Sequence, residues 1–522
     1  MFNKVLSGSL HGVEGRLIAV EADVSEGLPA FSMVGFLASE VREAGDRVRT
    51  ALKNSGFHFP PKKVTVNLSP ADIRKEGAAF DLPISIALLS AYGFIPEAYT
   101  EDILIIGELS LNGDLKGVRG ILPIVDYAKK SGIKKIILPY ENRKEAAMIP
   151  NIEVYGASTL IEVVDHLLDN NQIEPECFDI NSLKKSNSFN IDFSDVKGQE
   201  SLKRATEIAV AGMHNILFIG PPGAGKSMIA KRIPTIMPEL TYDESVELTK
   251  IYSVNGMISS NQGLIVNRPF RTPHHTITPQ ALLGGGLYPK PGEISLAHNG
   301  VLFLDELLEF QKNTLEMLRQ PIEDGIITIS RLQGSYTFPC KFMLVAAMNP
   351  CHCGYFPDRQ KCRCTTPQIE RYLHKLSQPM LDRMDMCLSV KRITYEELYE
   401  DSDRKNINTD SVENYTSDDM RSRIVKAINI QSERNEHDNT IVFNSQIKEK
   451  DIDKYLGLGT KEIELRKKVF ESYDLTARGA SKILKVARTI ADLDGSDKVK
   501  CDHLWEALSY RINDYYTGGD GV

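Results

Sequence analysis

"NILFIGPPGAGKS", residues 215–227, sets the architecture of the central part of this 522-residue chain. An apolar run forms a strand pattern, the loop after it matches the phosphate-loop pattern G-x-x-x-x-G-K-[ST], and a helical pattern follows as far as Pro234. Glycines let successive backbone N–H groups turn inward onto phosphate oxygens, and the helix N-terminus adds its positive end. The stretch therefore predicts a strand, a phosphate-binding turn and a helix.

The predicted ligand of this loop is a nucleoside triphosphate, and the alternative is a chance glycine-rich turn. Lys226 is expected to reach the β and γ phosphates, and Ser227 to place its hydroxyl on Mg²⁺. The predicted cofactor-binding residues are Gly220, Pro221, Pro222, Gly223, Ala224, Gly225, Lys226 and Ser227.

Two later apolar strands end in polar residues that suit triphosphate hydrolysis. "VLFLDEL" ends in Asp305, which is expected to hold the metal through water, and Glu306, which is expected to orient and deprotonate the attacking water. "FMLVAAMN" ends in Asn349, which either positions the same water or is a strand-terminal turn residue. Together with the phosphate loop, these residues predict Mg-dependent ATP hydrolysis.

The chain is too long for one hydrophobic core, and its pattern predicts three parts. Residues 1–168 alternate strand-like segments ("RLIAVEADV", "KVTVNL", "KKIILP") with a helix-like one ("SEVREAGDRVRTALKNSG"), which indicates an α+β domain. Residues 169–190 read as a linker, and 191–392 as an α/β domain with neighbouring buried strands. Residues 393–515 begin with a polar connection and continue as a small all-α domain.

Composition excludes several classes of protein. No apolar run approaches the roughly 20 residues that span a bilayer, and the first residues lack the core of a signal peptide. Four of the eight cysteines crowd into "CHCGYFPDRQKCRC" and so do not form a disulfide framework, which predicts a cytoplasmic protein. The net charge of −8 argues against a surface coated in positive charge but leaves room for a basic channel.

The order of phosphate loop, Asp-Glu pair and strand-terminal Asn resembles that of the AAA+ ATPases. The resemblance gives two arginines candidate roles. Arg383 in "PMLDRMD" would reach a neighbour's γ-phosphate, and Arg478 in "LTARGASKILKVARTIADL" would sense the nucleotide from a helical lid. For either residue alone, a solvated surface charge is the alternative. A finger that acts in trans implies a ring, and we expect a homohexamer.

Between Ser227 and Asp305 the chain is longer than a minimal ATPase needs. Prolines and three glycines at 284–286 in "RPFRTPHHTITPQALLGGGLYPKPGEISLAHNG" favour loops or a hairpin. Such loops either project into a ring's pore and track a polyanion, serve only as structure, or hold a metal at the two histidines. A second hairpin, "DGIITISRLQGSYTFP", is expected to carry Ser330 and Arg331 near its tip. The residues that give the first insertion positive character are Arg268, Arg271, His274, His275 and Lys290.

The motifs "RPFRTPHH", "PGEISLAHNGVLFLDELLEF", "LRQPIEDG" and "MNPCHCGY" resemble more closely the magnesium-chelatase-like ATPases of the ComM (YifB) type. The resemblance implies a ring-forming motor that couples ATP hydrolysis to movement along single-stranded or branched DNA, in branch migration during recombination or natural transformation. A magnesium-chelatase motor subunit and a protein-remodelling ATPase are the alternative functions.

Cys351, Cys353, Cys362 and Cys364 place four thiolates within fourteen residues. Tetrahedral Zn²⁺ takes four such ligands, although the C-x-C spacing is tighter than the usual C-x₂-C. The alternatives are a structural zinc site and four reduced surface cysteines.

The N-terminal part resembles the proteolytic domain of Lon protease, with the ribosomal S5 domain 2-like fold, through "GELSLNGDLKGVRGILPIVDYAKKSGIKKIILPYENRKEA". The resemblance places its catalytic serine at Ala79 and its lysine at Leu122, so both halves of the dyad are missing. Ser69 and Lys75 are nearby substitutes that would need a shifted register. We expect a domain that binds, gates or helps to assemble the ring. Its basic residues that either meet DNA or form a solvated face are Arg42, Arg47, Arg49, Lys62 and Lys63.

Overall fold

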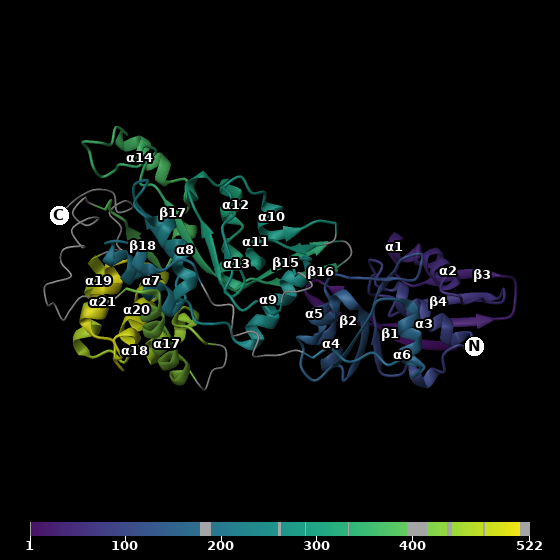
Figure 1. Cartoon of the computed structure of the whole chain (residues 1–522). Helices are drawn as coiled ribbons and strands as arrows, with labels where there is room; N and C mark the ends of the chain where they lie inside the picture. Colours follow the sequence, from purple (N-terminus) through teal and green to yellow (C-terminus); the bar gives the residue numbers. More distant parts are fainter. Residues whose placement is uncertain are drawn as a thin grey trace.

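The computed structural model describes residues 2–177, 189–258, 263–287, 289–331, 334–393, 415–435, 441–472 and 476–511. Residues 178–188 of the linker predicted at 169–190 lie outside the described residues, as do residues 394–414, which hold most of the predicted polar connection, and the last residues of the predicted C-terminal domain. The chain is a mixed α/β protein with a helical C-terminal region, and Figure 1 shows the N-terminal sheet at one end of an elongated body. The domain boundaries at 168, 190 and 392 stay predictions.

The N-terminal part is built on a seven-stranded mixed sheet with the order β3-β4-β2-β1-β5-β8-β9. β2 pairs antiparallel with β1 and β4, whereas β3, β5, β8 and β9 join through parallel pairs. The predicted strands are confirmed as parts of β2, β4 and β8. The strands are β1 (Phe2–His11), β2 (Glu14–Ser25), β3 (Ala30–Val34), β4 (Lys63–Ser69), β5 (Ile103–Ile105), β8 (Lys135–Pro139) and β9 (Glu153–Ala157), with β6 (Glu108–Leu109) and β7 (Leu115–Lys116) as a separate pair.

Helices cover this sheet, and the central one is buried along its whole length. α3 (Asp81–Ala91) has no exposed residue, as expected for a helix that is apolar on all sides. The helix predicted near residue 39 is present but interrupted at Glu43, which separates α1 (Ser39–Arg42) from α2 (Ala44–Asn54). The remaining helices of this part are α4 (Ile121–Lys130), α5 (Arg143–Ala147) and α6 (Leu160–Leu167).

The central part contains a five-stranded parallel sheet with the order β11-β14-β17-β10-β18. The three strands predicted to be buried neighbours are confirmed as adjacent, and every residue of β14, β17 and β10 is buried. Because all strands run in the same direction, their carboxyl ends meet at one edge, where α/β proteins usually bind ligands. The strands are β10 (Ile216–Ile219), β11 (Phe270–Arg271), β14 (Val301–Leu304), β17 (Met343–Met348) and β18 (Met386–Ser389).

The helix after the phosphate loop is longer than predicted. α8 (Lys226–Ile236) contains Pro234 in its last turn and does not end there. A proline lacks only one N–H, so a last turn can accommodate it when the chain leaves the helix soon afterwards. The other elements of this part are α7 (Glu200–Gly212), α9 (Tyr242–Val254), α10 (Pro279–Leu283), β12 (Gly284–Gly285), β13 (Lys290–Pro291), α11 (Glu293–Leu296), α12 (Lys312–Glu316), α13 (Arg319–Asp324), β15 (Ile326–Arg331), β16 (Gly334–Pro339), α14 (Thr366–Leu373) and α15 (Gln378–Leu381).

The C-terminal region is helical, as predicted, but it shares a hydrophobic core with the central part. Ile424 and Ile490 belong to the same buried cluster as Ile208 of α7 and Ile233 of α8. Figure 1 shows these helices packed beside α7 and α8. They are α17 (Ser417–Arg434), α18 (Ile452–Leu456), α19 (Thr460–Ser472), α20 (Ala477–Leu493) and α21 (Cys501–Ser509). None of the described helices combines the length and apolar character that crossing a bilayer requires.

His214, which follows α7, contacts α20. Its burial predicts that the free energy of unfolding depends on pH. The side chain is completely buried, and its Nε2 lies 2.8 Å from Thr489 Oγ1. Burial lowers the pKa of His214 to about 4, against an opposing effect of Asp385. In the unfolded chain the histidine pKa is near 6.5, so between pH 6.5 and 4 the unfolded chain binds more protons than the folded one. The free energy of unfolding therefore falls by on the order of 3 kcal/mol as the pH falls through this window.

Thermal unfolding at pH 7.5 and at pH 4.5 measures this effect. We expect the midpoint of the wild-type chain to fall more on acidification than that of His214→Gln, because glutamine does not titrate. His374→Gln removes an exposed histidine and serves as the control. Equal losses in the wild type and in His214→Gln would show that the buried imidazole does not titrate in this range.

The N-terminal part packs against the central part at two places. α9 contacts α4 and α5: Lys250 pairs with Asp126, and the Tyr242 hydroxyl donates to the carbonyl of Met148 at 2.9 Å. The β15–β16 hairpin meets the β1–β2 turn, where Tyr336 stacks on His11 with ring centroids 4.8 Å apart. In Figure 1, α9 and this hairpin lie on the side of the central part that faces the N-terminal sheet.

Candidate nucleotide site and cysteine cluster

The phosphate loop joins β10 to α8 at the carboxyl edge of the parallel sheet. Gly223 and Gly225 adopt φ values of 77° and 85°, and nothing lies within 4 Å of where a Cβ would be added at either position. Glycine is therefore required by the backbone and also leaves the loop open to a ligand. α8 begins at Lys226, so its free N–H groups point toward the loop, an arrangement that binds phosphate.

The structure brings four of the predicted residues together at this edge. Ser227 Oγ donates to Asp305 Oδ2 at 2.6 Å, and Lys226 Nζ donates to Asn349 Oδ1 at 3.2 Å. Lys226 Nζ also donates to the carbonyl of Gly220 at 2.6 Å. These contacts join the ends of β10, β14 and β17. Asn349 thus makes a specific contact with the phosphate-loop lysine, which a simple turn residue would not need.

Lys226 is mostly buried in this position, and burial lowers its pKa to about 8, against the opposing effect of the Asp305 carboxylate. A buried ammonium without an anionic partner is unfavourable, so a phosphate group would satisfy it. The Ser227 hydroxyl and the Asp305 carboxylate are adjacent oxygen donors, the type of ligand that Mg²⁺ prefers. The residues present therefore fit both a triphosphate and its metal.

Glu306 lies at the same edge in a left-handed backbone conformation. Its φ is 51°, and its backbone N–H donates to Asp305 Oδ1 at 2.9 Å. The side chain is 60% exposed, as a base that takes a proton from water must be accessible. Its Oε2 lies 3.6 Å from Nδ1 of His275 in the insertion. Sequence reasoning missed this contact, because 31 residues separate the two side chains along the chain.

Both candidate arginines lie at the opposite edge of the sheet. The side chain of Asn215, which precedes β10, donates to the carbonyl of Arg383 at 3.2 Å, whereas Lys226 follows β10. Arg383 Nη2 pairs with Glu323 at 2.8 Å, and Arg478 Nη1 lies 3.6 Å from the same carboxylate. The structure therefore groups Arg383 and Arg478 with each other, and not with the phosphate loop of their own chain. Their roles at a nucleotide stay predictions.

Arg392 is a further residue that the sequence did not reveal. Its guanidinium donates to the carbonyl of Pro222 at 3.4 Å and lies 5.3 Å from the centre of the Tyr355 ring. It follows β18 without any recognisable pattern, so only the fold brings it to the phosphate loop. A Cβ added to Gly354 would lie 2.6 Å from Cδ of Pro222, so the cysteine-containing loop packs directly on the phosphate loop.

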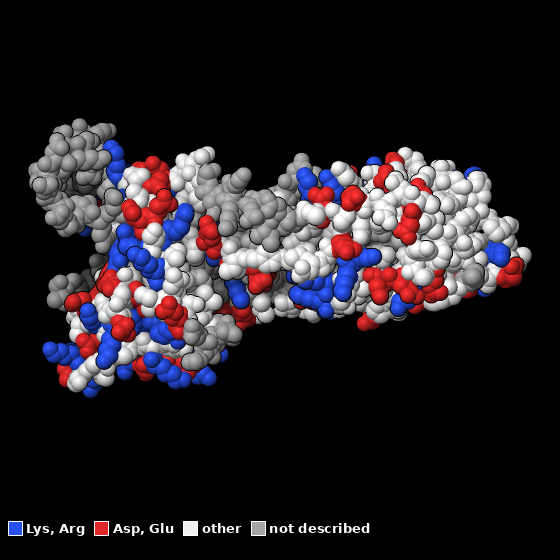
Figure 2. All heavy atoms as spheres, turned by 60° about the horizontal axis from the view of Figure 1, so that its bottom comes forward, with Lys and Arg blue, Asp and Glu red and all other residues white. Residues whose placement is uncertain are grey.

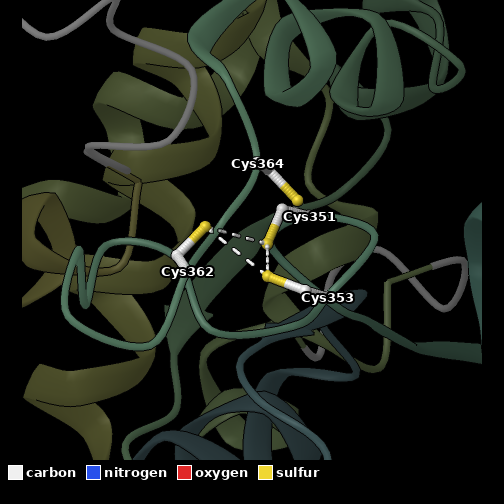
Figure 3. Close-up of side chains that lie close together, drawn as sticks. All are labelled: Cys351, Cys353, Cys362 and Cys364. Atoms are coloured by element: carbon white, nitrogen blue, oxygen red, sulfur yellow. Dashed lines mark hydrogen bonds between the residues drawn. The ribbon is translucent and has the colours of Figure 1, made fainter.

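The four predicted cysteines form one cluster (Figure 3), and their sulfur atoms all lie within 4.8 Å of one another. The Sγ of Cys351 lies 3.4 Å from that of Cys353 and 3.8 Å from that of Cys362. Four sulfurs at about 2.3 Å from a tetrahedral Zn²⁺ are about 3.8 Å apart, so these thiols fit the metal. Desolvation raises the pKa of Cys353, but hydrogen bonds from the backbone of Tyr355 and from the neighbouring thiols lower it to about 6.

The fit favours zinc over four unrelated surface cysteines, since Cys351 and Cys362 are buried. His352 points elsewhere, with its ring 4.5 Å from that of Tyr372. Among the described residues, His274 and His275 belong to no comparable cluster of three or more metal-ligating side chains. Their rings are 4.0 Å apart and pack against each other.

Two basic residues of the insertion, Arg268 and Arg271, are paired with carboxylates, whereas Lys290 is exposed. Arg268 is buried, donates to the carbonyl of Pro238 at 2.7 Å and pairs with Glu244 at 3.1 Å. Arg271 forms a two-pronged pair with Glu293, with both contacts at 2.7 Å. The prediction that Arg268 contributes positive charge to a polymer-binding loop is therefore wrong, because Arg268 is buried and its charge is balanced by Glu244.

The second hairpin is confirmed, with Ser330 opposite Ser335 and Arg331 opposite Gly334 beside the tip. Arg331 Nε donates to the carbonyl of Gly286 at 3.4 Å, so this hairpin touches the loop that joins β12 to β13. The two insertions that the sequence singled out are therefore neighbours in space.

The two positions at which the Lon resemblance places the catalytic dyad lie at the contact with α9. Ala79 and Leu122 pack in one hydrophobic cluster with Val246 of α9. The backbone N–H of Leu122 donates to Glu145 Oε1 at 3.1 Å, and the Ser253 hydroxyl of α9 donates to the same oxygen at 2.5 Å. Burial raises the pKa of Glu145, against these hydrogen bonds. A contact between two parts of the chain thus occupies the region where the dyad would be.

The substitute residues do not form a dyad in the described contacts. Lys75 is buried, and its Nζ donates to the carbonyl of Pro70. Three of the five basic residues predicted for this part are engaged in contacts: Arg47 pairs with the buried Asp81 at 2.9 Å, and Lys62 with Glu26 at 2.8 Å. Arg49 lies over the ring of Phe31. These contacts favour a structural role for the three side chains over a contact with DNA.

Comparison with known proteins matches nearly the whole chain to one family. Residues 192–398 match the family model of magnesium chelatase, subunit ChlI; residues 20–142 match subunit ChlI of Mg-chelatase; and residues 414–511 match the C-terminal part of magnesium chelatase subunit ChlI.

Several curated proteins are similar over most of their length. The chain is 40% identical to competence protein ComM of Haemophilus influenzae over 97% of both chains, and 41% identical to YifB of Escherichia coli over 96% of both. Lon protease 2 of Bacillus subtilis is 30% identical over 190 residues, 34% of each chain, which supports the predicted Lon-like N-terminal part. The phosphate loop, the acidic strand end and these similarities agree, and the chain belongs to the ComM/YifB family of magnesium-chelatase-like AAA+ proteins.

Proposed function

We propose that this protein is the subunit of a ring-shaped motor that couples Mg-dependent ATP hydrolysis to movement along DNA, with branch migration in recombination or natural transformation as its task. The observation that carries the proposal is the pair of contacts Ser227–Asp305 and Lys226–Asn349 at the carboxyl edge of a parallel sheet. The chain is also similar over nearly its full length to a protein named for competence.

Each residue at this edge has a role that its position permits. Bound MgATP supplies the phosphoanhydride bond and the metal that neutralises its charge. Lys226 would bind the β and γ phosphates, while Ser227 and Asp305 would hold the metal. Glu306 takes the proton of the attacking water, and Asn349 orients that water from the end of β17.

The arginines support a ring. Arg383 and Arg478 line a cavity of about 740 Å³ at the amino edge of the sheet, together with Lys482 and Glu323. Arg383 pairs with Glu323 at this edge, away from the phosphate loop of its own chain, which supports a role at the nucleotide of a neighbouring subunit, whereas Arg478 would sense a nucleotide from the helical region. A homo-oligomer, which we propose is a hexamer, supplies that neighbour.

Local features support DNA as the polymer. Lys and Arg are interspersed with Asp and Glu over the face shown in Figure 2, so binding depends on particular sites and not on net charge. One such site is a cavity of about 660 Å³ where the N-terminal part meets the insertions. Its lining includes the basic Arg16, Arg74 and Lys290, the aromatic Tyr127 and Tyr336, and the acidic Asp72 and Glu76. Basic side chains beside aromatic rings are typical of surfaces that bind single strands.

Steady-state ATP hydrolysis with no polymer and with single-stranded, double-stranded and branched DNA tests the proposal. We expect the rate to rise most on branched DNA and the rise to disappear at high salt, because phosphate contacts release counterions. Lys226→Ala is the negative control, since it removes the phosphate-binding ammonium.

The same assay separates the alternatives. A protein-remodelling ATPase would respond to unfolded protein and ignore DNA, and a chelatase motor subunit would respond only to a metallating partner with its porphyrin. Wild-type hydrolysis that no DNA changes would refute the DNA motor while leaving the ATPase assignment standing.

A further inference from the structure

The segment that follows β18 runs along the first residues of the phosphate loop. A Cβ added to Gly220 would lie 2.3 Å from the carbonyl oxygen of Val390, so the two backbones touch. The side chain of Gln199, which precedes α7, donates to the carbonyl of Lys391 at 2.8 Å. Backbone contacts on both sides therefore fix the place from which the next side chain, that of Arg392, extends.

The guanidinium of Arg392 is exposed and loosely held. Its Nη2 donates to the carbonyl of Pro222 at 3.4 Å, longer than the roughly 2.9 Å of a typical N–H···O bond. It also lies 5.3 Å from the centre of the Tyr355 ring. In the part of the chain that the structure describes, no carboxylate pairs with this guanidinium, whereas Arg268 and Arg383 each have a glutamate partner. Most of the N–H donors of Arg392 are therefore available to a ligand.

Two cations of the same chain contact neighbouring carbonyls of the phosphate loop. Lys226 Nζ donates to the carbonyl of Pro221 at 3.0 Å, and Arg392 donates to that of Pro222. The next residue is Gly223, where an added Cβ would meet nothing within 4 Å. Arg392 therefore borders the open part of the loop, where phosphate oxygens would lie.

The neighbours of Pro222 place Arg392 toward the end of the site where hydrolysis takes place. Pro222 packs on Gly354, which belongs to the loop that starts at Asn349. Asn349 contacts Lys226 and is the residue proposed to orient the water that attacks the γ-phosphate. Arg392 thus lies on the side of the phosphate loop that the γ-phosphate is expected to occupy.

The chemistry of a guanidinium suits that phosphate. A triphosphate retains negative charge when Mg²⁺ and one lysine are bound to it. A guanidinium is always charged and can donate two parallel hydrogen bonds to phosphate oxygens, which makes it a stronger partner for phosphate than a backbone carbonyl is for the guanidinium.

We propose that Arg392 binds the γ-phosphate of the nucleotide in its own chain, and that it leaves the Pro222 carbonyl and the Tyr355 ring when the triphosphate binds. This role differs from that of Arg383, which we place at the nucleotide of a neighbouring subunit. The inference rests on the proposed function only in that the ligand is ATP, and it does not depend on DNA.

Equilibrium binding of ADP and of a non-hydrolysable ATP analogue to Arg392→Ala tests the inference. The affinity for the ATP analogue is expected to fall about tenfold, as for the loss of a hydrogen bond between charged groups, and that for ADP to change less than about threefold, since ADP has no γ-phosphate. Arg392→Lys keeps the charge and should recover part of the affinity for the ATP analogue.

Lys391→Ala is the matched control, because Lys391 is the adjacent exposed cation and contacts Gln199 through its backbone; it should bind both nucleotides like the wild type. An unchanged affinity of Arg392→Ala for the ATP analogue would overturn the inference, while a loss of binding in Lys226→Ala would still support the phosphate site. An equal loss for both nucleotides would also overturn it, because Arg392 would then only maintain the shape of the loop. A wild-type chain that binds neither nucleotide would refute the ATP site itself, and this inference with it.

Discussion

Glu306→Gln is expected to lower kcat for ATP hydrolysis by at least about 100-fold, because a positioned general base contributes roughly 10²–10⁴ in rate. Glutamine has the same shape but cannot accept a proton. The side chain is exposed, so the substitution leaves no cavity. ATP affinity should change by less than about threefold, since the interaction that is removed belongs to the transition state.

Phosphate release and the binding of a fluorescent ATP analogue measure these two quantities separately. Glu309→Gln is the matched control: it removes a half-exposed carboxylate three residues away, which lies 3.9 Å from Lys375, and should hydrolyse ATP like the wild type. Lys226→Ala should instead lose binding. Wild-type hydrolysis by Glu306→Gln would assign the base to another residue.

Cys351→Ser is expected to reduce bound zinc from about one ion per chain to background, since the metal needs four ligands of this kind. Cys351 is completely buried, and removing one ligand leaves three thiolates without a partner. Structural zinc contributes about 10–16 kcal/mol in small isolated domains. We therefore expect a large fall in the midpoint of thermal unfolding.

The position of the cluster adds a second readout. Because Gly354 packs on Pro222, loss of zinc should also weaken ATP binding. Elemental analysis, thermal unfolding and nucleotide binding are compared for the wild type, the wild type treated with a chelator, and Cys177→Ser, which removes an exposed cysteine outside the cluster. Purified wild-type protein that contains no zinc, and that unfolds at the same temperature as Cys351→Ser, would refute a zinc site.

Local patterns in the sequence were sufficient for the nucleotide site. Four apolar residues before a glycine-rich loop predicted β10, and the same logic predicted β14 and β17. Side chains at the carboxyl ends of adjacent parallel strands must converge. The contacts of Lys226 with Asn349 and of Ser227 with Asp305 follow from that rule. The four cysteines converge for a similar reason, since only fourteen residues hold them all.

Other properties depended on partners that are distant in the chain. Arg268 and Lys290 carry the same charge. Arg268 is buried, where it pairs with Glu244 and donates to the carbonyl of Pro238, whereas Lys290 is exposed. No pattern in the sequence distinguishes these two residues, because burial depends on which distant segments of the chain pack around each side chain.

The sequence alone determined the phosphate loop, the acidic strand end and the thiol cluster, because short-range patterns specify strands, turns and helix starts. Only the tertiary structure decided that Arg383 and Arg478 share Glu323 at the edge away from their own nucleotide loop. It also decided that His275 lies beside Glu306 and that Val246 of α9 packs with Ala79 and Leu122. Each of these contacts joins two elements that are distant in the sequence. It depends on how those elements are oriented when they pack, which no local pattern encodes.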